Sequence, residues 1–381
     1  MTRIGLVVNP VAGLGGRVGL GGTDGPDRAR VALSLGARPR AGARAAAALG
    51  ELAARAGGPA RDGLLVVTAA GPLGAGSVAA AGLAARIVYT AGAGRDTSAA
   101  DTAAAVRAVV AEGVDLLLFA GGDGTARDVL GAVGGVPCPV LGVPTGVKMH
   151  SAVFAVSPRA AGEVAAAWLA RAGGVRLRDA EVMDRDEDAL REGRVTSRLF
   201  GGLSVPDVPV RVQQRKTGST ATSPGAVGGI AAEVAERIGT GLLVLGPGST
   251  TRAVAAALGA DVSLTGVDAL ALRPGHPPRI VARDACEDTL LALGPAWIAL
   301  SPIGGQGFLL GRGNQQISPR VLRAAGGREH LLVLCTEAKL AALGGRPLLL
   351  DTGDDALDAE LSGHLPVITG RRRTSLYRLA M

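Results

Sequence analysis

The feature of this sequence that most constrains its fold is the alternation of short apolar runs with alanine-rich segments of helical length. The strand candidates in the first 150 residues are Ile4–Val8, Leu64–Thr68, Arg86–Tyr89, Asp115–Ala120 and Pro139–Leu141. The helix candidates between them are Ala41–Arg55, Ser77–Ala85, Thr97–Glu112 and Thr125–Val133. This spacing predicts a doubly wound parallel sheet with helices on both faces. Most of the runs are continuously apolar, as strands buried on both faces require.

The pattern changes after about residue 150. Three strand-like segments follow one another at Val175–Met183, Val195–Leu203 and Val208–Val212. Alternation then resumes at Leu242–Leu245, Arg252–Leu258, Ser263–Val267, Arg279–Ala282, Trp297–Leu300 and Leu331–Leu334. We therefore predict an α/β nucleotide-binding domain over residues 1–148 and a β-rich α/β substrate-side domain over 149–381. A return of the last segment to the first domain is left open.

Composition excludes several classes of protein. Glycine and proline are abundant, at 59 and 21 residues, but 48% of the chain is hydrophobic and only 19% is charged, which excludes a disordered chain. The net charge is +7, yet 37 of the 40 basic residues are arginine, as expected from a GC-rich genome, and aromatic residues make up 2%. We therefore predict no nucleic-acid partner. Three scattered cysteines and the lack of an apolar run near ~18 residues predict a cytoplasmic protein without a membrane segment.

The strongest local signal is a glycine-rich turn between the fourth predicted strand and a helix. Gly121, Gly122 and Gly124 permit close backbone approach, so several N–H groups can converge on phosphate oxygens. The helix that follows presents its positive end to the same anion, and Thr125 can add a hydroxyl or cap the helix. Asp123 among phosphates must bind a metal or accept a proton. The alternative is a tight strand-to-helix turn capped by the aspartate.

Two further loops follow predicted strands of the same sheet. Asn9 and Gly13 follow the first strand, where a plain strand-to-helix connection is an equally good interpretation. Thr145, Lys148 and His150 follow the fifth strand. A lysine is rare in this arginine-dominated chain, so we predict a phosphate contact for it, against a solvated loop lysine. For the histidine we weigh a contact with a substrate hydroxyl or base against a structural role.

The second half of the chain offers two glycine-rich loops and two acidic clusters. Ser249 and Thr250 end the first loop, and Gln306 and Asn314 lie in the second, which resembles a ligand-approaching loop or a structural hairpin. The acidic clusters are Asp184–Asp188 and the group Asp351, Asp354 and Asp355. Either could bind Mg²⁺, but solvated turns and a helix N-terminus explain both. The metal ligands are left unassigned.

Together these loops resemble a known superfamily. Asn-Pro-x-Ala-Gly after the first strand, Gly-Gly-Asp-Gly-Thr and then Pro-Thr-Gly are similar to the NAD kinase and diacylglycerol kinase superfamily. Gly246–Thr250 resembles the Thr-Pro-Thr-Gly-Ser-Thr segment of NAD kinases. The runs Pro302–Phe308 and Gly311–Gln316 look like the ATP-NAD kinase subgroup related to acetoin-catabolism protein X. The resemblance spans most of the chain and is thinnest over 28–61 and 213–228.

The resemblance implies an NAD kinase-like fold and a kinase that uses ATP, or polyphosphate, with Mg²⁺ to phosphorylate the 2′-hydroxyl of the adenosine ribose of NAD. It places the phosphates on the Gly-Gly-Asp-Gly-Thr turn and the acceptor nucleotide on Ser249 and Thr250, and it makes Asp123 the residue that activates the acceptor hydroxyl or organises the metal. The Asn-Glu pair of well-studied NAD kinases does not occur in this sequence. A kinase for a lipid or small metabolite, and a non-catalytic nucleotide-binding regulator, therefore remain alternatives, and homo-oligomerisation is left open.

Overall fold

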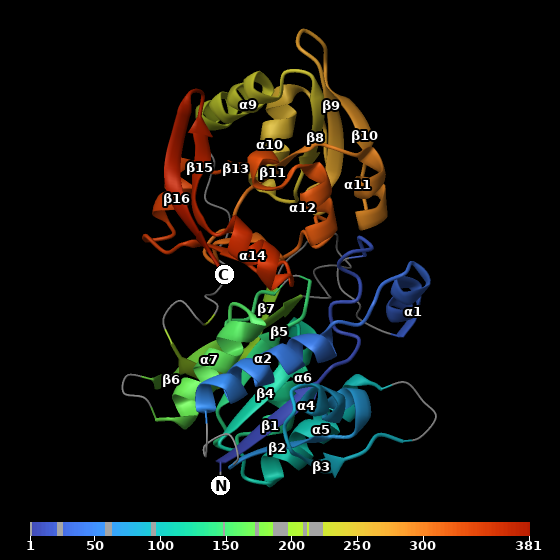
Figure 1. Cartoon of the computed structure of the whole chain (residues 1–381), viewed down its shortest axis with the longest axis vertical. Helices are drawn as coiled ribbons and strands as arrows, with labels where there is room; N and C mark the ends of the chain where they lie inside the picture. Colours follow the sequence, from blue (N-terminus) through green and yellow to red (C-terminus); the bar gives the residue numbers. More distant parts are fainter. Residues whose placement is uncertain are drawn as a thin grey trace. The chain divides into compact units, whose positions relative to one another are not determined.

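The structure is a computed structural model that describes residues 2–20, 26–57, 63–92, 97–147, 149–171, 175–185, 197–208, 212 and 224–381 (Figure 1). The chain forms two compact units. The first comprises Met1–Leu14, Gly22–Ser34 and Arg38–Arg215, and the second comprises Gly15–Gly21, Leu35–Ala37 and Lys216–Met381. Within the described residues, no helix is long and apolar enough to cross a membrane.

The first unit is built on a parallel five-stranded sheet of order β3-β2-β1-β4-β5, which confirms the predicted fold class. Its strands are β1 (Thr2–Val8), β2 (Leu64–Ala69), β3 (Ala85–Tyr89), β4 (Leu116–Gly121) and β5 (Val140–Pro144). Its helices are α1 (Pro26–Ser34), α2 (Ala41–Ala56), η1 (Gly71–Leu73), α4 (Ala75–Ala80), α5 (Ala99–Ala111), α6 (Asp123–Val133) and α7 (Pro158–Leu169). The central strands are continuously buried and apolar over Ile4–Val8 of β1 and over the whole of β4, as a sheet covered on both faces requires.

Helices cover both faces of this sheet (Figure 1). The helices α2 and α7 pack together against β4 and β5, while α5 and α6 pack together on the opposite face. Gly162 of α7 permits the close approach of α2, because a Cβ at this position would lie 2.4 Å from the carbonyl oxygen of Ala48. The chain leaves β1 toward β2 and later returns to β4 on the other side of β1. The carboxyl ends of β1 and β4 therefore flank the topological switch point, where ligands of such sheets bind.

An antiparallel ribbon completes the first unit. It consists of β6 (Arg176–Arg185) and β7 (Ser197–Asp207). The boundary predicted between residues 148 and 149 falls inside this unit, because α7 packs on α2 and the ribbon packs on α6 and β5. Of the strand predicted over Val208–Val212, the described residues show only an isolated bridge between Ala155 and Val212.

The second unit contains a mixed nine-stranded sheet of order β10-β9-β8-β11-β13-β15-β16-β14-β12. Its strands are β8 (Gly241–Leu245), β9 (Asp268–Leu272), β10 (Arg279–Ala282), β11 (Trp297–Leu300), β12 (Phe308–Leu310), β13 (Leu331–Leu334), β14 (Leu348–Leu350), β15 (Gly363–Gly370) and β16 (Arg373–Ala380). Its helices are α9 (Pro224–Ile238), α10 (Ser249–Leu258), α11 (Glu287–Leu293), α12 (Pro319–Ala325), η2 (Gly327–His330), α13 (Glu337–Ala341) and α14 (Asp355–Leu361). The last strand, β16, pairs with β15 and β14, so the final segment is part of this sheet.

The segment Ser263–Val267, where the alternation was expected to continue, is irregular. Residues 264–266 form a bend, and the strand β9 begins at Asp268. The Asp268 carboxylate accepts hydrogen bonds from the backbone N–H groups of Ser263 and Asp284, and the Ser263 hydroxyl accepts one from Gly266. These local bonds satisfy the backbone groups that a strand ladder would otherwise use.

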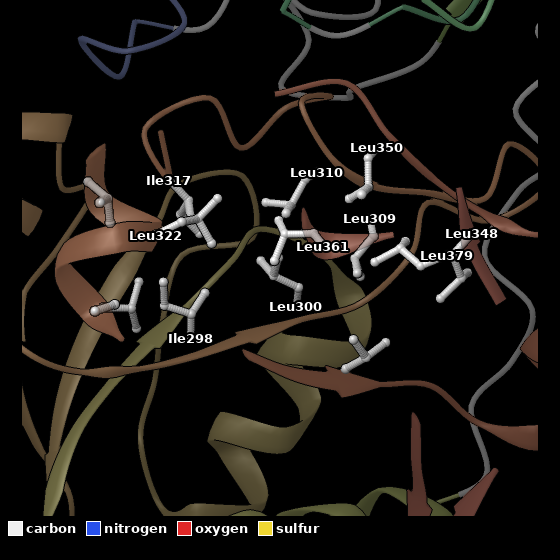
Figure 2. Close-up of a cluster of buried hydrophobic side chains, with 14 of the residues drawn as sticks. Ile298, Leu300, Leu309, Leu310, Ile317, Leu322, Leu348, Leu350, Leu361 and Leu379 are labelled. Carbon is white, nitrogen blue, oxygen red and sulfur yellow. The ribbon is translucent and has the colours of Figure 1, made fainter. Parts of the chain in front are cut away.

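Apolar side chains from distant parts of the chain form the core of the second unit. Figure 2 shows a cluster contributed by β11, β12, β14, β16, α12, α14 and the loop before α12. Its labelled members are Ile298, Leu300, Leu309, Leu310, Ile317, Leu322, Leu348, Leu350, Leu361 and Leu379. A second cluster, which includes Ile230 and Val234 of α9 and Val254 of α10, packs with Leu243 and Leu245 of β8. This packing fixes the carboxyl end of β8, after which the candidate residues Ser249 and Thr250 lie.

Candidate active site

The Gly-Gly-Asp-Gly-Thr turn links β4 directly to α6, and its tight geometry requires glycine. A Cβ on Gly121 would lie 2.3 Å from the Cβ of Thr125, and one on Gly122 would lie 3.2 Å from the Cα of Gly146. Gly122 is the N-cap of α6, so Asp123 and Gly124 begin the first turn of the helix. The turn therefore brings the backbone N–H groups at the start of α6 to the carboxyl end of β4.

Asp123 is a buried carboxylate held by the loop that follows β5. Its residue surface is 8% exposed. Oδ2 accepts a hydrogen bond from the backbone N–H of His150 at 2.7 Å. Oδ1 accepts two bonds from Ser151, from the backbone N–H at 3.0 Å and from the hydroxyl at 2.6 Å. These three donors fix the carboxylate in one orientation at the sheet edge.

The surroundings of Asp123 raise its pKa to about 7. Burial is the largest cause, because it disfavours the charged form, and the negative charge of Asp184 acts in the same direction. The hydrogen bonds from Ser151 and His150 oppose this rise. Burial likewise raises the pKa of Asp128, one turn along α6, to about 6. A carboxyl group with a pKa close to neutrality can both take up and release a proton at physiological pH.

The loop after β1 lies beside this turn. The Asn9 side-chain amide donates a hydrogen bond to the Thr125 hydroxyl at 3.0 Å, while its carbonyl oxygen accepts one from the N–H of Val11. Gly13 has a φ of +79°, and a Cβ there would lie 1.9 Å from the carbonyl oxygen of Thr145. The Thr145 N–H in turn donates to the carbonyl of Gly121 at 2.9 Å. The three predicted loops of the first unit are thus in mutual contact at the switch point.

The loop after β5 carries two polar side chains predicted to contact a ligand, those of Thr145 and His150. The hydroxyl oxygen of Thr145 is buried and has no hydrogen-bond partner among the described residues. The Nδ1 atom of His150 lies 2.7 Å from the hydroxyl oxygen of Ser197, the first residue of β7. The His150 side chain therefore connects the loop after β5 to the ribbon, and the backbone N–H of the same residue connects this loop to Asp123. Lys148, the third residue predicted in this loop, lies outside the described residues.

In the second unit, Ser249 and Thr250 begin α10 after the loop that ends β8. The Nζ of Lys339, on α13, donates hydrogen bonds to the hydroxyls of Thr250 at 3.4 Å and of Ser301 at 2.9 Å. Ser301 follows β11 and Thr336 caps the helix that carries the lysine. Sequence reasoning missed Lys339 and Ser301, because the contacts of the lysine with Ser301 and Thr250 depend on the order of β8, β11 and β13 in the sheet. The rarity of lysine in this chain was the one signal available.

The second glycine-rich loop of this unit is held largely by its own polar groups. Asn314 accepts a hydrogen bond from the N–H of Gly311 at 2.9 Å and donates one to the carbonyl of Leu309 at 2.8 Å. Gln306 is buried. Arg312 is also buried, where it forms an ion pair with Asp351 and lies over the Phe308 ring at 4.4 Å. The structure thus gives Asn314 a role in shaping the loop, and substrate contacts by Gln306 and Asn314 stay predictions.

The two acidic clusters are explained by local structure where the chain is described. Asp184 forms an ion pair with Arg127 at 3.1 Å, and the remaining residues of that cluster lie outside the described residues. Asp351 pairs with Arg312, whereas Asp354 caps α14 through the N–H of Leu357 at 3.0 Å. Over the described part of the chain, no group of three or more His, Cys, Asp or Glu side chains is arranged to hold a metal ion.

Comparison with known proteins adds an independent finding. Residues 4–172 match the family model of the ATP-NAD kinase N-terminal domain, and residues 241–379 match that of the ATP-NAD kinase C-terminal domain. These two segments include all the candidate residues of both units. A search of curated proteins and a search of solved structures gave no match.

Proposed function

Because the chain belongs to the ATP-NAD kinase family and is a kinase, a phosphotransferase acting on an NAD-like substrate, we propose that it transfers the γ-phosphoryl group of ATP to NAD. The acceptor is the 2′-hydroxyl of the adenosine ribose, and the product is NADP. The observation that carries this proposal is the buried Asp123 carboxylate at the switch point, held by Ser151 and His150 with its pKa raised to about 7.

In this mechanism Asp123 acts as the general base. Its carboxylate accepts the proton of the acceptor hydroxyl as the hydroxyl oxygen forms a bond to the γ-phosphorus. The bond between that phosphorus and the oxygen bridging to the β-phosphate breaks, and ADP leaves with the bonding electron pair. Phosphoryl transfer depends mainly on positioning and on neutralisation of charge. A base that is ionised near pH 7 but still readily protonated suits the first step.

The Gly-Gly-Asp-Gly-Thr turn supplies the phosphate contacts in this proposal. Gly121, Gly122 and Gly124 have no side chains, so we propose that the backbone N–H groups at the start of α6 can approach a phosphate closely. Thr125 adds a hydroxyl that Asn9 already orients through its amide. The partial positive charge of the helix N-terminus favours an anion at this position.

The resemblance also implies Mg²⁺ as a companion of ATP. Magnesium is typically bound through one or two carboxylates together with substrate phosphates and water. We propose that the ion enters with ATP, held by its phosphates. When bound it would neutralise phosphate charge. We assign no protein ligand to it.

The test is an assay of NADP formation from NAD, ATP and Mg²⁺. The protein is expected to form NADP, and Asp123→Asn is expected to lower kcat by about 10²- to 10⁴-fold, the usual contribution of a general base. Asp128→Asn is the matched control, because it removes a neighbouring carboxyl group on the same helix whose pKa is also raised. Absence of NADP formation by the unmodified protein would overturn the proposal. Equal activity of the Asp123 variant would remove this residue from the mechanism.

The missing Asn-Glu pair motivates a second candidate, a kinase for another hydroxyl acceptor. Thermal-shift measurements with ATP, NAD and small polyols, followed by ADP-release assays with each acceptor, separate the candidates. ADP release with a polyol or lipid but not with NAD would favour this alternative. Stabilisation by NAD without turnover would favour a nucleotide-binding regulator. The same assays with polyphosphate in place of ATP test the phosphoryl donor.

A further inference from the structure

Ser151 is the side chain in closest contact with Asp123. It is fully buried, with an exposed fraction of 0%. Besides lying 2.6 Å from Asp123 Oδ1, its hydroxyl oxygen lies 3.0 Å from the backbone N of Met183 and 2.8 Å from the backbone carbonyl oxygen of the same residue. Met183 belongs to β6, at the point where the pairing register with β7 shifts. The hydroxyl thus lies between the carboxylate and the edge of the ribbon.

The number of protons and lone pairs on the hydroxyl limits these contacts. A serine hydroxyl has one proton to donate and can accept two hydrogen bonds. The N–H of Met183 can only donate, so it uses one of the accepting positions. The single hydroxyl proton then has two acceptors within reach, Asp123 Oδ1 and the Met183 carbonyl. It can be donated to only one of them at a time.

We propose that Ser151 is a positioning residue whose hydroxyl follows the protonation state of Asp123. This inference rests on the proposed role of Asp123 as the general base. When the carboxylate is ionised, the serine O–H donates to Oδ1 and stabilises the negative charge. When the carboxyl group has taken up a proton, that proton is held at Oδ1 and donated to the serine oxygen, and the serine O–H turns to the Met183 carbonyl.

The two states differ in which acceptor receives the serine proton. In the ionised state the serine oxygen accepts from the Met183 N–H and donates to the carboxylate. In the protonated state it accepts from both Met183 N–H and the carboxyl O–H and donates to the Met183 carbonyl. No covalent bond of Ser151 breaks, and only its O–H rotates. The carboxyl group of this buried base therefore keeps a hydrogen bond to the serine hydroxyl whether or not it carries the proton, and an unpaired buried carboxyl group would be costly.

The other charged or titratable groups around Asp123 act on it in a different way. On α6 these are Arg127 and Asp128, on β6 Asp184, and on the loop after β5 His150. Asp184 raises the pKa of Asp123 by its charge and is itself paired with Arg127. The His150 contact to the carboxylate comes from a backbone N–H, which keeps its proton in both states. Only Ser151 among these residues offers a hydroxyl that can reverse its direction.

The test measures the ionisation of Asp123 directly, using ¹³C-carboxyl-labelled aspartate and NMR titration of the full chain. The Asp123 resonance is assigned by its loss in Asp123→Asn. In Ser151→Ala its pKa is expected to rise by about one to two pH units, because the charge-assisted bond that the serine donates to the ionised form is stronger than the bond that it accepts from the protonated form. Ser151→Cys keeps the volume and a weak donor, so an intermediate rise is expected. Ser157→Ala is the matched control, because the Ser157 hydroxyl caps α7 by accepting a hydrogen bond from the N–H of Ala160.

The kinetic counterpart is the pH profile of kcat/KM. In Ser151→Ala the acid limb should move up by the same one to two pH units, so activity below neutral pH falls about 10- to 100-fold and recovers at alkaline pH. A loss of activity that is equal at all pH values would indicate a structural role and overturn the proposal. An unchanged Asp123 pKa in Ser151→Ala, or an equal rise in Ser157→Ala, would overturn it too. If the unmodified protein forms no NADP, the proposed function fails, while the NMR titration still decides the role of Ser151.

Discussion

The ionised carboxylate of Asp123 destabilises the folded protein, so Asp123→Asn is expected to stabilise it at alkaline pH. Burial raises the pKa from 3.8 to about 7, which means that the folded protein binds this proton more tightly than the unfolded chain does. The contribution of this group to stability therefore falls as the pH rises from about 4 to about 7. Above that pH the carboxyl is ionised in both states, and the full penalty applies.

The magnitude follows from the two pKa values. A difference of one pKa unit corresponds to about 1.4 kcal/mol, so the penalty at pH 8 is about 4 kcal/mol. At pH 5 the unfolded chain is largely ionised while the folded protein keeps its proton, and the penalty is about 2 kcal/mol. Asparagine carries no such penalty, but its amide N–H₂ can face the His150 N–H, a loss that is independent of pH. The pH-dependent part of the difference is therefore about 2 to 3 kcal/mol.

The measurement is urea unfolding of the unmodified protein and Asp123→Asn at pH 5 and pH 8. The free energy of unfolding of the variant minus that of the unmodified protein should be more positive at pH 8 than at pH 5 by about 2 to 3 kcal/mol. The destabilisation caused by the asparagine amide is the same at both pH values, so it cancels when the two pH values are compared. The same difference at both pH values would show that Asp123 titrates near its ordinary value, and the assignment of the general base would lose its electrostatic support.

The fold of the first unit could be predicted because its signals are local. Continuous apolar runs such as that of β4 occur only where both faces of a strand are covered. A parallel sheet then places the ends of its strands at one edge, which is why Asn9 and Thr125 could be expected near each other before their hydrogen bond was seen. The domain boundary could not be predicted, since it depends on the packing of α7 and the ribbon against the sheet.

The partners of the candidate residues were harder to predict than the residues themselves. Asp123 stands out in the sequence, but Ser151 binds it from 28 positions further on, through the local path of the loop after β5. The contact of Ser151 with Met183 adds a strand of the ribbon, 32 positions away. Lys339 meets Thr250 only because β8, β11 and β13 are neighbours in the sheet. Side-chain identity gives the chemistry of a site, whereas strand order and loop path give its geometry.

Three further predictions follow from buried and strained positions. First, kcat/KM should fall about tenfold per pH unit below the Asp123 pKa of about 7, measured in initial-rate assays, because only the ionised carboxylate accepts a proton. Second, Arg312→Met should lower the free energy of urea unfolding by about 3–5 kcal/mol, since it removes the ion-pair partner of the buried Asp351 carboxylate, and adding Asp351→Leu should restore much of the loss. Third, Gly13→Ala should destabilise the protein more than Gly36→Ala does. Both glycines have positive φ, +79° and +83°, so alanine strains the backbone at each position by about 1 kcal/mol. At Gly13 the new Cβ also lies 1.9 Å from a backbone oxygen, whereas nothing lies within 4 Å at Gly36. Because the obstructing atom is the backbone carbonyl oxygen of Thr145, the loop after β1 and the loop after β5 must move apart. The free energy of urea unfolding of Gly13→Ala is therefore expected to fall by about 3 kcal/mol. An equal fall in the free energy of unfolding for Gly13→Ala and Gly36→Ala would show that the loops after β1 and β5 do not pack against each other in solution.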